Sequence, residues 1–260
     1  MITRIFTSRT QPRIGRRAPR APDGMRIYAI GDIHGRADKL EELGALIEAD
    51  MAERSAGEET VLVFLGDYID RGPDSRAVID MLVDGPALPA RTVFLKGNHE
   101  AMLLAFLDDP SYGLAWRDYG GRDTMASYGL GSAMTKLKAI TDGRATEALA
   151  AALPKSHHAF FQSLELSVVF GDYAFVHAGI RPDTPLDAQK ENDLMWIRAP
   201  FLDWNRDLEH VVVHGHTPSE SPQVRRHRIG IDTGACDTGV LTAVCLEGDR
   251  HRFLQTSPDA

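Results

Sequence analysis

Four short motifs, far apart in the chain, combine glycines with Asp, His and Asn, which are side chains that hold divalent metal ions in proteins. They read Gly-Asp-Ile-His-Gly (31–35), Gly-Asp-Tyr-Ile-Asp-Arg-Gly (66–72), Gly-Asn-His-Glu (97–100) and His-Gly-His-Thr (214–217), with a separate His-Ala-Gly at 177–179. Each of the first three follows a short apolar run and precedes a segment with helical periodicity. We therefore expect these side chains on loops at the ends of neighbouring strands.

A repeating strand–loop–helix pattern surrounds the first three motifs. Buried strands are predicted at residues 26–30, 60–65 and 91–96, and amphipathic helices at 37–51, 75–83 and 100–107. This alternation predicts parallel strands joined by crossover helices. Ligands of such sheets gather beyond the carboxyl ends of the strands, where the motifs begin. The predicted fold class is α/β, with the functional residues at one edge of the sheet.

The remaining segments differ in character from this repeat. Residues 108–163 lack strand signals and are predicted to form a helical insertion, or cap, beside the site. From residue 164 onwards short strands alternate with tight turns, which predicts a mainly β layer packed on the first sheet. We interpret residues 25–260 as one domain. Residues 1–24, with six arginines and one acid, are interpreted as a basic, disordered arm.

Charge and cysteine content narrow the class of protein. The chain carries a net charge of −8 in spite of the basic arm, and an acidic body does not suit nucleic-acid binding. The arm is interpreted mainly as a solvated tail, with docking to a partner or an anionic surface as the weaker alternative. No apolar run approaches the roughly 18 residues of a membrane span. Cys236 and Cys245 are predicted to be free thiols, and no export signal follows Arg16-Arg17, so a cytoplasmic location is expected.

The motif residues suit a pair of divalent metal ions. Asp32 and His34 alternate along a strand end, so both could reach one ion, and the two carboxylate oxygens of Asp67 could bridge to a second. That second ion would be completed by the amide oxygen of Asn98, by His177 and by either His214 or His216. Two such ions can share a hydroxide and hold it in line with a phosphorus atom. The sequence therefore predicts a two-metal phosphoester hydrolase.

Three neighbours of these ligands suit the rest of the reaction. Arg71 can donate a bidentate pair of hydrogen bonds to phosphate oxygens. His99 directly follows Asn98 and is free to act as the general acid on the leaving oxygen, while Asp70 could orient it and raise its pKa. Glu100 is predicted to cap the helix that begins here.

At these motifs the chain resembles the phosphoprotein phosphatases, the serine/threonine-specific branch of the calcineurin-like metallophosphoesterases, and looks like a bacterial or phage-type member. The resemblance implies a central two-sheet β-sandwich flanked by helices, and two divalent ions, with manganese expected and iron, zinc or cobalt also suited to the ligands. The implied ligands of the first ion are Asp32, His34 and Asp67. Those of the second are Asp67, Asn98, His177 and His216, which leaves His214 as a supporting residue.

The resemblance also implies roles in catalysis and substrate binding. His99 with Asp70 would be the acid pair, and Arg71, Asn98 and a second arginine, which Arg198 fits by position, would bind the phosphate. The leading hypothesis is a protein phosphatase for phosphoserine and phosphothreonine in a phosphoprotein or phosphopeptide, with phosphotyrosine left open. The alternatives are a symmetrical dinucleoside tetraphosphate hydrolase and an inactive metal-binding scaffold. Substrate choice is expected to depend on residues 108–163 and 179–210.

Overall fold

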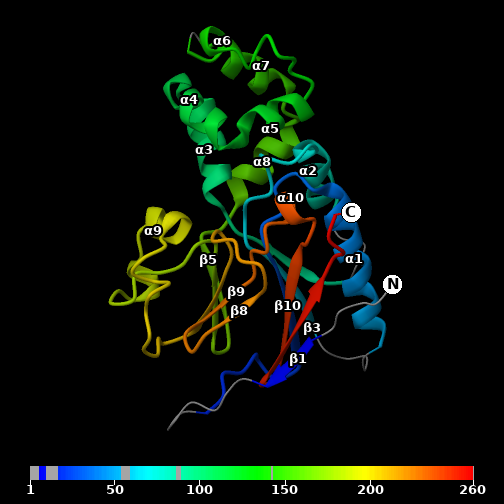
Figure 1. Ribbon diagram of the computed structural model, residues 1–260, viewed down its shortest axis with the longest axis vertical. Helices are drawn as coiled ribbons and strands as arrows, with labels where there is room; N and C mark the ends of the chain where they lie inside the picture. The colour runs from blue at the N-terminus through cyan, green and yellow to red at the C-terminus, as the bar shows by residue number, and fades with distance from the viewer. Residues whose placement is uncertain (1–5, 10–16, 54–58, 86–88, 142, 260) are drawn as a thin grey trace.

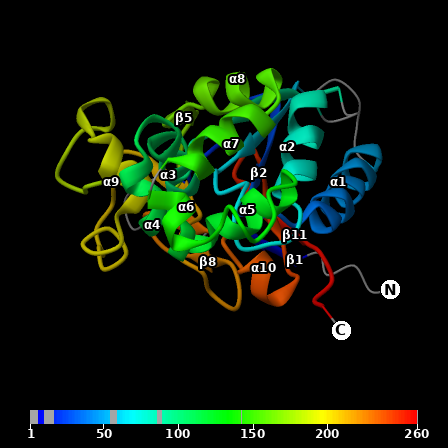
Figure 2. The same ribbon diagram turned by 90° about the horizontal axis from the view of Figure 1, so that it is seen from above.

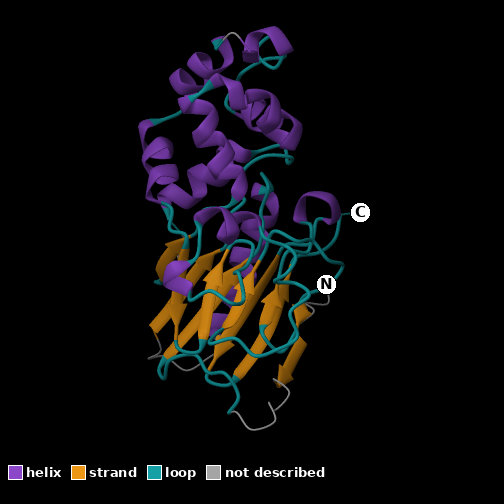
Figure 3. Ribbon diagram, turned by 90° about the vertical axis from the view of Figure 1, so that its left-hand side faces the viewer, coloured by secondary structure: helices purple, strands orange, loops and turns teal. Residues whose placement is uncertain are grey.

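Two β-sheets lie face to face, and a group of helices covers one end of them (Figures 1 and 3). The computed structural model describes residues 6–9, 17–53, 59–85, 89–141 and 143–259. Strands and helices are separate layers in Figure 3, with the strands below and most helices above. This arrangement confirms the α/β sandwich that the resemblance implied. Among the described residues, none of the helices is both long enough and apolar enough to cross a membrane.

The first sheet combines the beginning and the end of the chain. It has six strands in the order β1-β11-β10-β2-β3-β4. Their bounds are Phe6–Arg9 (β1), Met25–Ile30 (β2), Glu59–Phe64 (β3), Arg91–Phe94 (β4), Thr242–Glu247 (β10) and Arg250–Gln255 (β11). The pairs β2·β3 and β3·β4 are parallel, as predicted. The strands β10 and β11 were expected in a separate layer, but β10 pairs antiparallel with β2 and extends this sheet.

The second sheet has five strands in the order β5-β6-β7-β9-β8. Their bounds are Ser167–Phe170 (β5), Tyr173–Val176 (β6), Val211–His214 (β7), Gln223–Val224 (β8) and Arg228–Gly230 (β9). The three inner strands are parallel to one another, and both edge strands run antiparallel to their neighbours. The carboxyl ends of β6 and β7 therefore lie at one edge of this sheet, as those of β2, β3 and β4 do in the first sheet.

The core between the sheets explains why they stack. Alternate side chains of β2 and β3, such as Ile27 and Val61, form a buried cluster with Phe175 of β6 and Val213 of β7. Full burial of each such side chain contributes about 1.5–3 kcal/mol. Successive residues of a strand point to opposite faces, so the other face of the first sheet needs its own cover.

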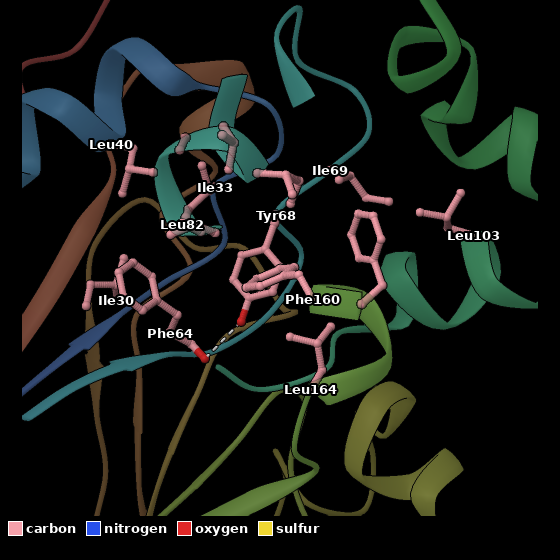
Figure 4. Packing of buried hydrophobic residues seen from close by; sticks show 14 of the residues in the cluster. Ile30, Ile33, Leu40, Phe64, Tyr68, Ile69, Leu82, Leu103, Phe160 and Leu164 are labelled. Carbon is pink, nitrogen blue, oxygen red and sulfur yellow. Dashed lines mark hydrogen bonds between the residues drawn. The ribbon is translucent and has the colours of Figure 1, made fainter. Parts of the chain in front are cut away.

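Helices cover that outer face of the first sheet. They are α1 (Ala37–Ala52), α2 (Ser75–Asp84), α3 (Asn98–Asp108) and α8 (Lys155–Ser163). Their apolar side chains pack with Phe64 and Tyr68, and the ring of Phe160 contacts that of Tyr68 (Figure 4). The Tyr68 hydroxyl donates to the carbonyl of Leu95 at 2.7 Å, so its polar end is also satisfied. The helix α2 begins where Asp74 accepts a hydrogen bond from the Ala77 backbone N–H, which is an ordinary N-cap.

The cap consists of short helices between α3 and α8. They are η1 (Pro110–Tyr112), α4 (Gly113–Trp116), η2 (Arg117–Gly121), α5 (Arg122–Ser127), α6 (Leu137–Thr141) and α7 (Arg144–Ala152). Viewed from above, these helices lie over the strands (Figure 2). A second covering segment, with η3 (Leu186–Ala188) and α9 (Glu191–Trp196), packs on the outer face of the second sheet, and α10 (Ala235–Thr238) precedes β10. The cap and α9 therefore approach the same end of the sandwich.

The described part of the N-terminal segment differs from a disordered arm. The backbone N–H of Ala21 donates to the Gly248 carbonyl at 2.9 Å, and that of Arg20 donates to the Asp172 carboxylate at 2.9 Å. Ala21 is also buried. In addition, β1 pairs with β11, which would otherwise leave an unpaired sheet edge. Residues 1–5 and 10–16 lie outside the described residues, so the expectation of disorder there stays a prediction.

Candidate functional site

The carboxyl ends of five strands bring the sequence motifs together beneath the cap. The motif side chains follow β2, β3, β4, β6 and β7. All of the predicted metal ligands are buried, namely Asp32, His34, Asp67, Asn98, His177 and His216. Parallel strands place their carboxyl ends at one edge, and this is why motifs almost two hundred residues apart meet in one site.

Asp67 lies at the centre of the site. Its Oδ2 is 3.5 Å from His34 Nε2, 3.8 Å from His99 Nε2 and 3.4 Å from His177 Nε2. Two sets of side chains hold their ligand atoms within 4.8 Å of one another: His34, Asp67 and His99 form one, and Asp67, His177 and His216 form the other. Because Asp67 belongs to both sets, its carboxylate is placed to bridge two cations.

His177 has the hydrogen-bonding pattern of a metal ligand. Its Nδ1 donates to the Leu65 carbonyl at 2.9 Å, which directs Nε2 into the site. That nitrogen lies 2.9 Å from Asn98 Oδ1 and 3.2 Å from His216 Nδ1. Burial lowers the pKa of His177, but the Asp67 carboxylate, together with Asp32 and Glu100, raises it to about 10 overall. Several electron-pair donors thus converge on one point, where a proton or a metal ion must balance them, so the residues fit a divalent ion.

Asp32 joins the second set through the backbone. Its Oδ2 accepts a hydrogen bond from the His216 N–H at 2.9 Å, while Oδ1 is buried with no hydrogen-bond partner among the described residues. His216 Nε2 is also buried and unpartnered within the described part of the chain. A buried polar atom without a partner is costly, and a metal ion would satisfy Asp32 Oδ1, whereas His216 faces the candidate ligands with its other nitrogen, Nδ1. Burial, and then the nearby Asp232 carboxylate, raise the pKa of Asp32 well above its usual range.

Asp232 was not singled out from the sequence. It was interpreted only as part of an Asp-Thr-Gly turn, and its Oδ1 does accept from the Gly234 backbone N–H at 2.9 Å. It is nevertheless buried, and burial together with the nearby Asp67 carboxylate raises its pKa to about 6. Its position directly after the parallel strand β9 was the signal that could have identified it as a neighbour of the site.

The two side chains predicted to act as an acid pair, His99 and Asp70, are hydrogen-bonded to each other, and the cap holds Asp70 in place. His99 Nδ1 donates to Asp70 Oδ2 at 2.7 Å, and both side chains are fully buried. The same carboxylate accepts from Trp116 Nε1 at 2.9 Å and from Thr124 Oγ1 at 2.5 Å. Burial lowers the pKa of His99, but Asp67 and Asp70 raise it above its usual value overall. His99 Nε2 is buried without a hydrogen-bond partner among the described residues. No sequence pattern marked Trp116 or Thr124.

Glu100 caps its helix as predicted, and it also ties two motifs together. Its carboxylate accepts from the backbone N–H groups of Gly97 and Asp67, each at 2.9 Å, and from that of Tyr68 at 2.8 Å. Burial and then the Asp67 carboxylate raise the pKa of Glu100 to about 7. The loop after β4 thereby fixes the backbone of the loop after β3, which carries the central carboxylate.

The two arginines predicted to bind phosphate flank the site. Arg71 Nη1 lies 3.2 Å from His34 Nε2, and its backbone N–H donates to the Gly120 carbonyl of the cap at 3.4 Å. Arg198 is exposed, as Arg71 is, and follows α9. Burial, followed by nearby charges that include Arg198, lowers the pKa of His216 to about 3.

His214 lies beside the two sets of candidate ligands and belongs to neither. Its Nδ1 donates to the Gly215 carbonyl at 3.0 Å, and its Nε2 accepts from Arg228 Nη1 at 3.3 Å. Both ring nitrogens are therefore engaged, and the ring supports the turn that carries His216.

Unusual backbone geometry is concentrated in the site. Within the described residues, the non-glycine positions with positive φ are His34 (46°), Asp67 (52°), Asp70 (72°), Arg71 (67°) and His216 (64°). This left-handed conformation is unfavourable for residues with a Cβ and persists where the surrounding structure enforces it, which is common at functional sites. The loops therefore hold these side chains at some cost in stability.

Comparison with known proteins agrees with this geometry. The sequence profile of the calcineurin-like phosphoesterases matches residues 25–240. The asymmetrical bis(5'-nucleosyl)-tetraphosphatase PrpE of Anoxybacillus flavithermus is 26% identical over 238 residues, which cover 83% of this chain and 88% of the relative. The corresponding protein of Halalkalibacterium halodurans is also 26% identical, over 85% of this chain and 89% of its own length.

Two solved structures share the fold. A protein proposed to be a diadenosine tetraphosphatase has a TM-score of 0.61 at 22% identity, with 94% of this chain and 99% of that chain covered. A mutant of a cold-active protein tyrosine phosphatase also has a TM-score of 0.61, at 19% identity, with coverage of 92% and 83%. The chain therefore belongs to the calcineurin-like phosphoesterase family, whose members are hydrolases that use divalent metal ions to cleave phosphoesters.

Proposed function

We propose that this chain is a metal-dependent phosphomonoesterase that removes phosphate from phosphoserine, phosphothreonine and phosphotyrosine side chains of proteins. The observation that carries the proposal is the buried pair of His99 and Asp70, with His99 Nε2 left free to act on a substrate. The alkoxides of serine and threonine are poor leaving groups, so their departure benefits from a proton donor. A cleaved phosphoanhydride needs such a donor much less, because its leaving phosphate is weakly basic.

The side chains divide between the proposed ions and the substrate. Asp32, His34 and Asp67 would hold the first ion, and Asp67, Asn98, His177 and His216 the second. When bound, these ions supply Lewis acidity and a nucleophilic water at neutral pH. Their oxygen and nitrogen donors suit manganese, which we propose, as well as iron, zinc and cobalt. By distance, His99 belongs to the same set of candidate ligands as His34 and Asp67. Its hydrogen bond to Asp70 nevertheless supports the role of general acid.

Arg71 and Arg198 would orient the substrate. Both side chains are exposed at the edge of the site, where guanidinium groups can donate to phosphate oxygens. The buried amide of Asn98, whose Oδ1 lies 2.9 Å from His177 Nε2, would donate through its nitrogen to a further phosphate oxygen. His99 would then transfer its Nε2 proton to the ester oxygen as the bond to phosphorus breaks.

The proposed acid is tested by a comparison of leaving groups. In the manganese-loaded protein, His99→Ala should lower kcat on a phosphoserine peptide by about 10²–10⁴-fold. The loss should be much smaller on p-nitrophenyl phosphate, whose leaving group needs no proton. His158→Ala, which removes an exposed histidine of α8, is the matched control and should have no effect. Equal losses on both substrates would contradict the acid role.

A second candidate is hydrolysis of dinucleoside polyphosphates, which the names of the curated relatives favour. Those relatives are named asymmetrical, whereas the sequence alternative was a symmetrical enzyme. Diadenosine tetraphosphate distinguishes the two by its products, because asymmetrical cleavage gives ATP and AMP and symmetrical cleavage gives two ADP. Fast nucleotide cleavage with inert phosphopeptides would replace the first proposal. Manganese binding without turnover of either substrate would instead indicate an inactive scaffold.

A further inference from the structure

We propose that Tyr119 and Trp196 form an aromatic wall on the leaving-group side of the site. The wall accepts a planar ring bonded directly to the ester oxygen, so among phosphorylated side chains the enzyme prefers phosphotyrosine to phosphoserine and phosphothreonine. This inference rests on the proposed phosphomonoesterase function and names the substrate class within it.

The two rings connect both halves of the candidate metal centre. Tyr119 lies in η2 of the cap and is 44% exposed, with its ring centroid 6.1 Å from that of His99. Trp196 ends α9 and is half-buried, with its centroid 5.8 Å from Tyr119 and 6.1 Å from His216. All three contacts are edge to face, at interplanar angles of 82°, 80° and 78°. The four rings thus form a continuous row from the proposed acid to the second set of ligands.

The backbone anchors both rings to functional residues. The carbonyl of Gly120, next to Tyr119, accepts from the Arg71 N–H, and a Cβ at Gly120 would lie only 2.7 Å from that nitrogen. On the other side, the Leu194 carbonyl of α9 accepts from the Ala178 N–H at 2.8 Å, directly after His177. A phosphate held by Arg71 therefore lies at a defined position relative to the wall, although the rings come from segments that are far apart in sequence.

Distance decides which kind of ring the wall can contact. Aromatic rings interact favourably at centroid separations of about 4.5–7 Å, a separation that Tyr119 already has from His99. His99 would contact the ester oxygen, so a ring in contact with Tyr119 must begin close to that oxygen. The phenyl ring of phosphotyrosine is bonded to it. Serine and threonine offer no ring, and the bases of a dinucleotide are separated from the cleaved phosphate by ribose and further phosphates.

The chemistry of the wall favours an aryl substrate over a purely aliphatic one. Tyr119 and Trp196 offer ring faces and edges, and an edge-to-face contact between rings is favourable beyond the gain from apolar burial. Tyr119 is among the few large apolar side chains that the described part of the chain leaves exposed, and it is the member that faces the proposed acid. A substrate ring in this position would contact Tyr119 and Trp196, while the ester oxygen bonded to that ring would contact His99.

The test uses one peptide sequence carrying phosphotyrosine, phosphoserine or phosphothreonine, with the full-length manganese-loaded enzyme. The wild type should hydrolyse the phosphotyrosine form with the highest kcat/KM. Tyr119→Leu should lower that value about threefold to tenfold, mainly through KM, and leave the other two peptides unchanged. Tyr119→Phe keeps the ring and should restore the preference. Trp196→Phe should have the smaller effect, because an aromatic face remains.

Tyr112→Leu is the matched control, because Tyr112 is an equally exposed cap tyrosine, 50% exposed, with no ring contact in the described structure. It should leave all three kcat/KM values unchanged. If Tyr119→Leu lowered kcat/KM equally on all three peptides, or left it unchanged on the phosphotyrosine peptide, the proposed aromatic wall would be wrong. The proposed phosphatase function would remain in place. If the wild type hydrolysed none of the three peptides and cleaved diadenosine tetraphosphate rapidly, the aromatic wall and the phosphatase function would both be wrong.

Discussion

The indole Nε1 of Trp116 donates a 2.9 Å hydrogen bond to Asp70 Oδ2, the same oxygen that accepts from His99 Nδ1. A cap residue therefore holds the carboxylate that orients the proposed acid, 46 residues away in sequence. Thr124 from the same cap donates to the other oxygen of that carboxylate. The cap is thus part of the machinery of the site as well as a cover above it.

Trp116→Phe should weaken catalysis selectively on poor leaving groups. A hydrogen bond to a charged group contributes about 1.5–3 kcal/mol, so we expect kcat on a phosphoserine peptide to fall roughly tenfold or more. The rate with p-nitrophenyl phosphate should fall much less. Tyr128→Phe is the control, because it removes a buried cap hydrogen bond to His157 at 2.8 Å that does not involve Asp70. A uniform loss with both substrates would indicate general damage to the fold.

Asp67→Asn should abolish high-affinity binding of manganese. The substitution removes the charge that both sets of candidate ligands share, so isothermal titration calorimetry should show a loss of more than about 100-fold in affinity, beyond the effect of a supporting residue. Asp80→Asn, at a half-exposed carboxylate of α2, should bind manganese as the wild type does. Retained affinity in Asp67→Asn would place the ions elsewhere.

Manganese binding should release protons. The pKa of His177 is raised to about 10, so in the metal-free protein its ring is protonated at neutral pH, and an ion must displace that proton from Nε2. The apparent affinity for manganese should therefore increase as the pH rises towards about 10, and it should be weaker at acidic pH. Titration calorimetry at pH 7.5 in buffers of different ionisation enthalpy measures the number of protons released. A binding enthalpy independent of the buffer would contradict this prediction.

Gly120→Ala should lower both the free energy of unfolding and the affinity of the site for phosphate. At φ 110° an alanine is strained, and its Cβ would press on the Arg71 backbone at 2.7 Å, so we expect a loss of about 1–3 kcal/mol in the free energy of unfolding. Gly129→Ala is the matched control, since φ is 83° there and the added Cβ meets nothing within 4 Å. Urea denaturation and inhibition by inorganic phosphate should both separate the two variants. Identical behaviour would mean that Arg71 does not depend on this contact.

The sequence alone predicted the chemistry of the site and the local structure around it. Glycine-flanked Asp, His and Asn residues after apolar runs indicated strand-end loops, and β2, β3 and β4 are indeed parallel with these loops at one edge. The local pattern was sufficient here because apolar periodicity and turn residues act over a few neighbours. It also predicted the bond between His99 and Asp70, whose motifs follow adjacent strands.

Only the tertiary structure decided which distant segments complete the site. The pairing of β10 with β2 adds the C-terminal strands to the first sheet, and the turn before them brings Asp232 close to Asp32. Trp116 reaches Asp70 because the cap folds back over the strand ends. Such contacts are selected by the packing of whole layers, so no short sequence pattern records them. The same holds for the left-handed backbone of Asp67, which the surrounding loops impose.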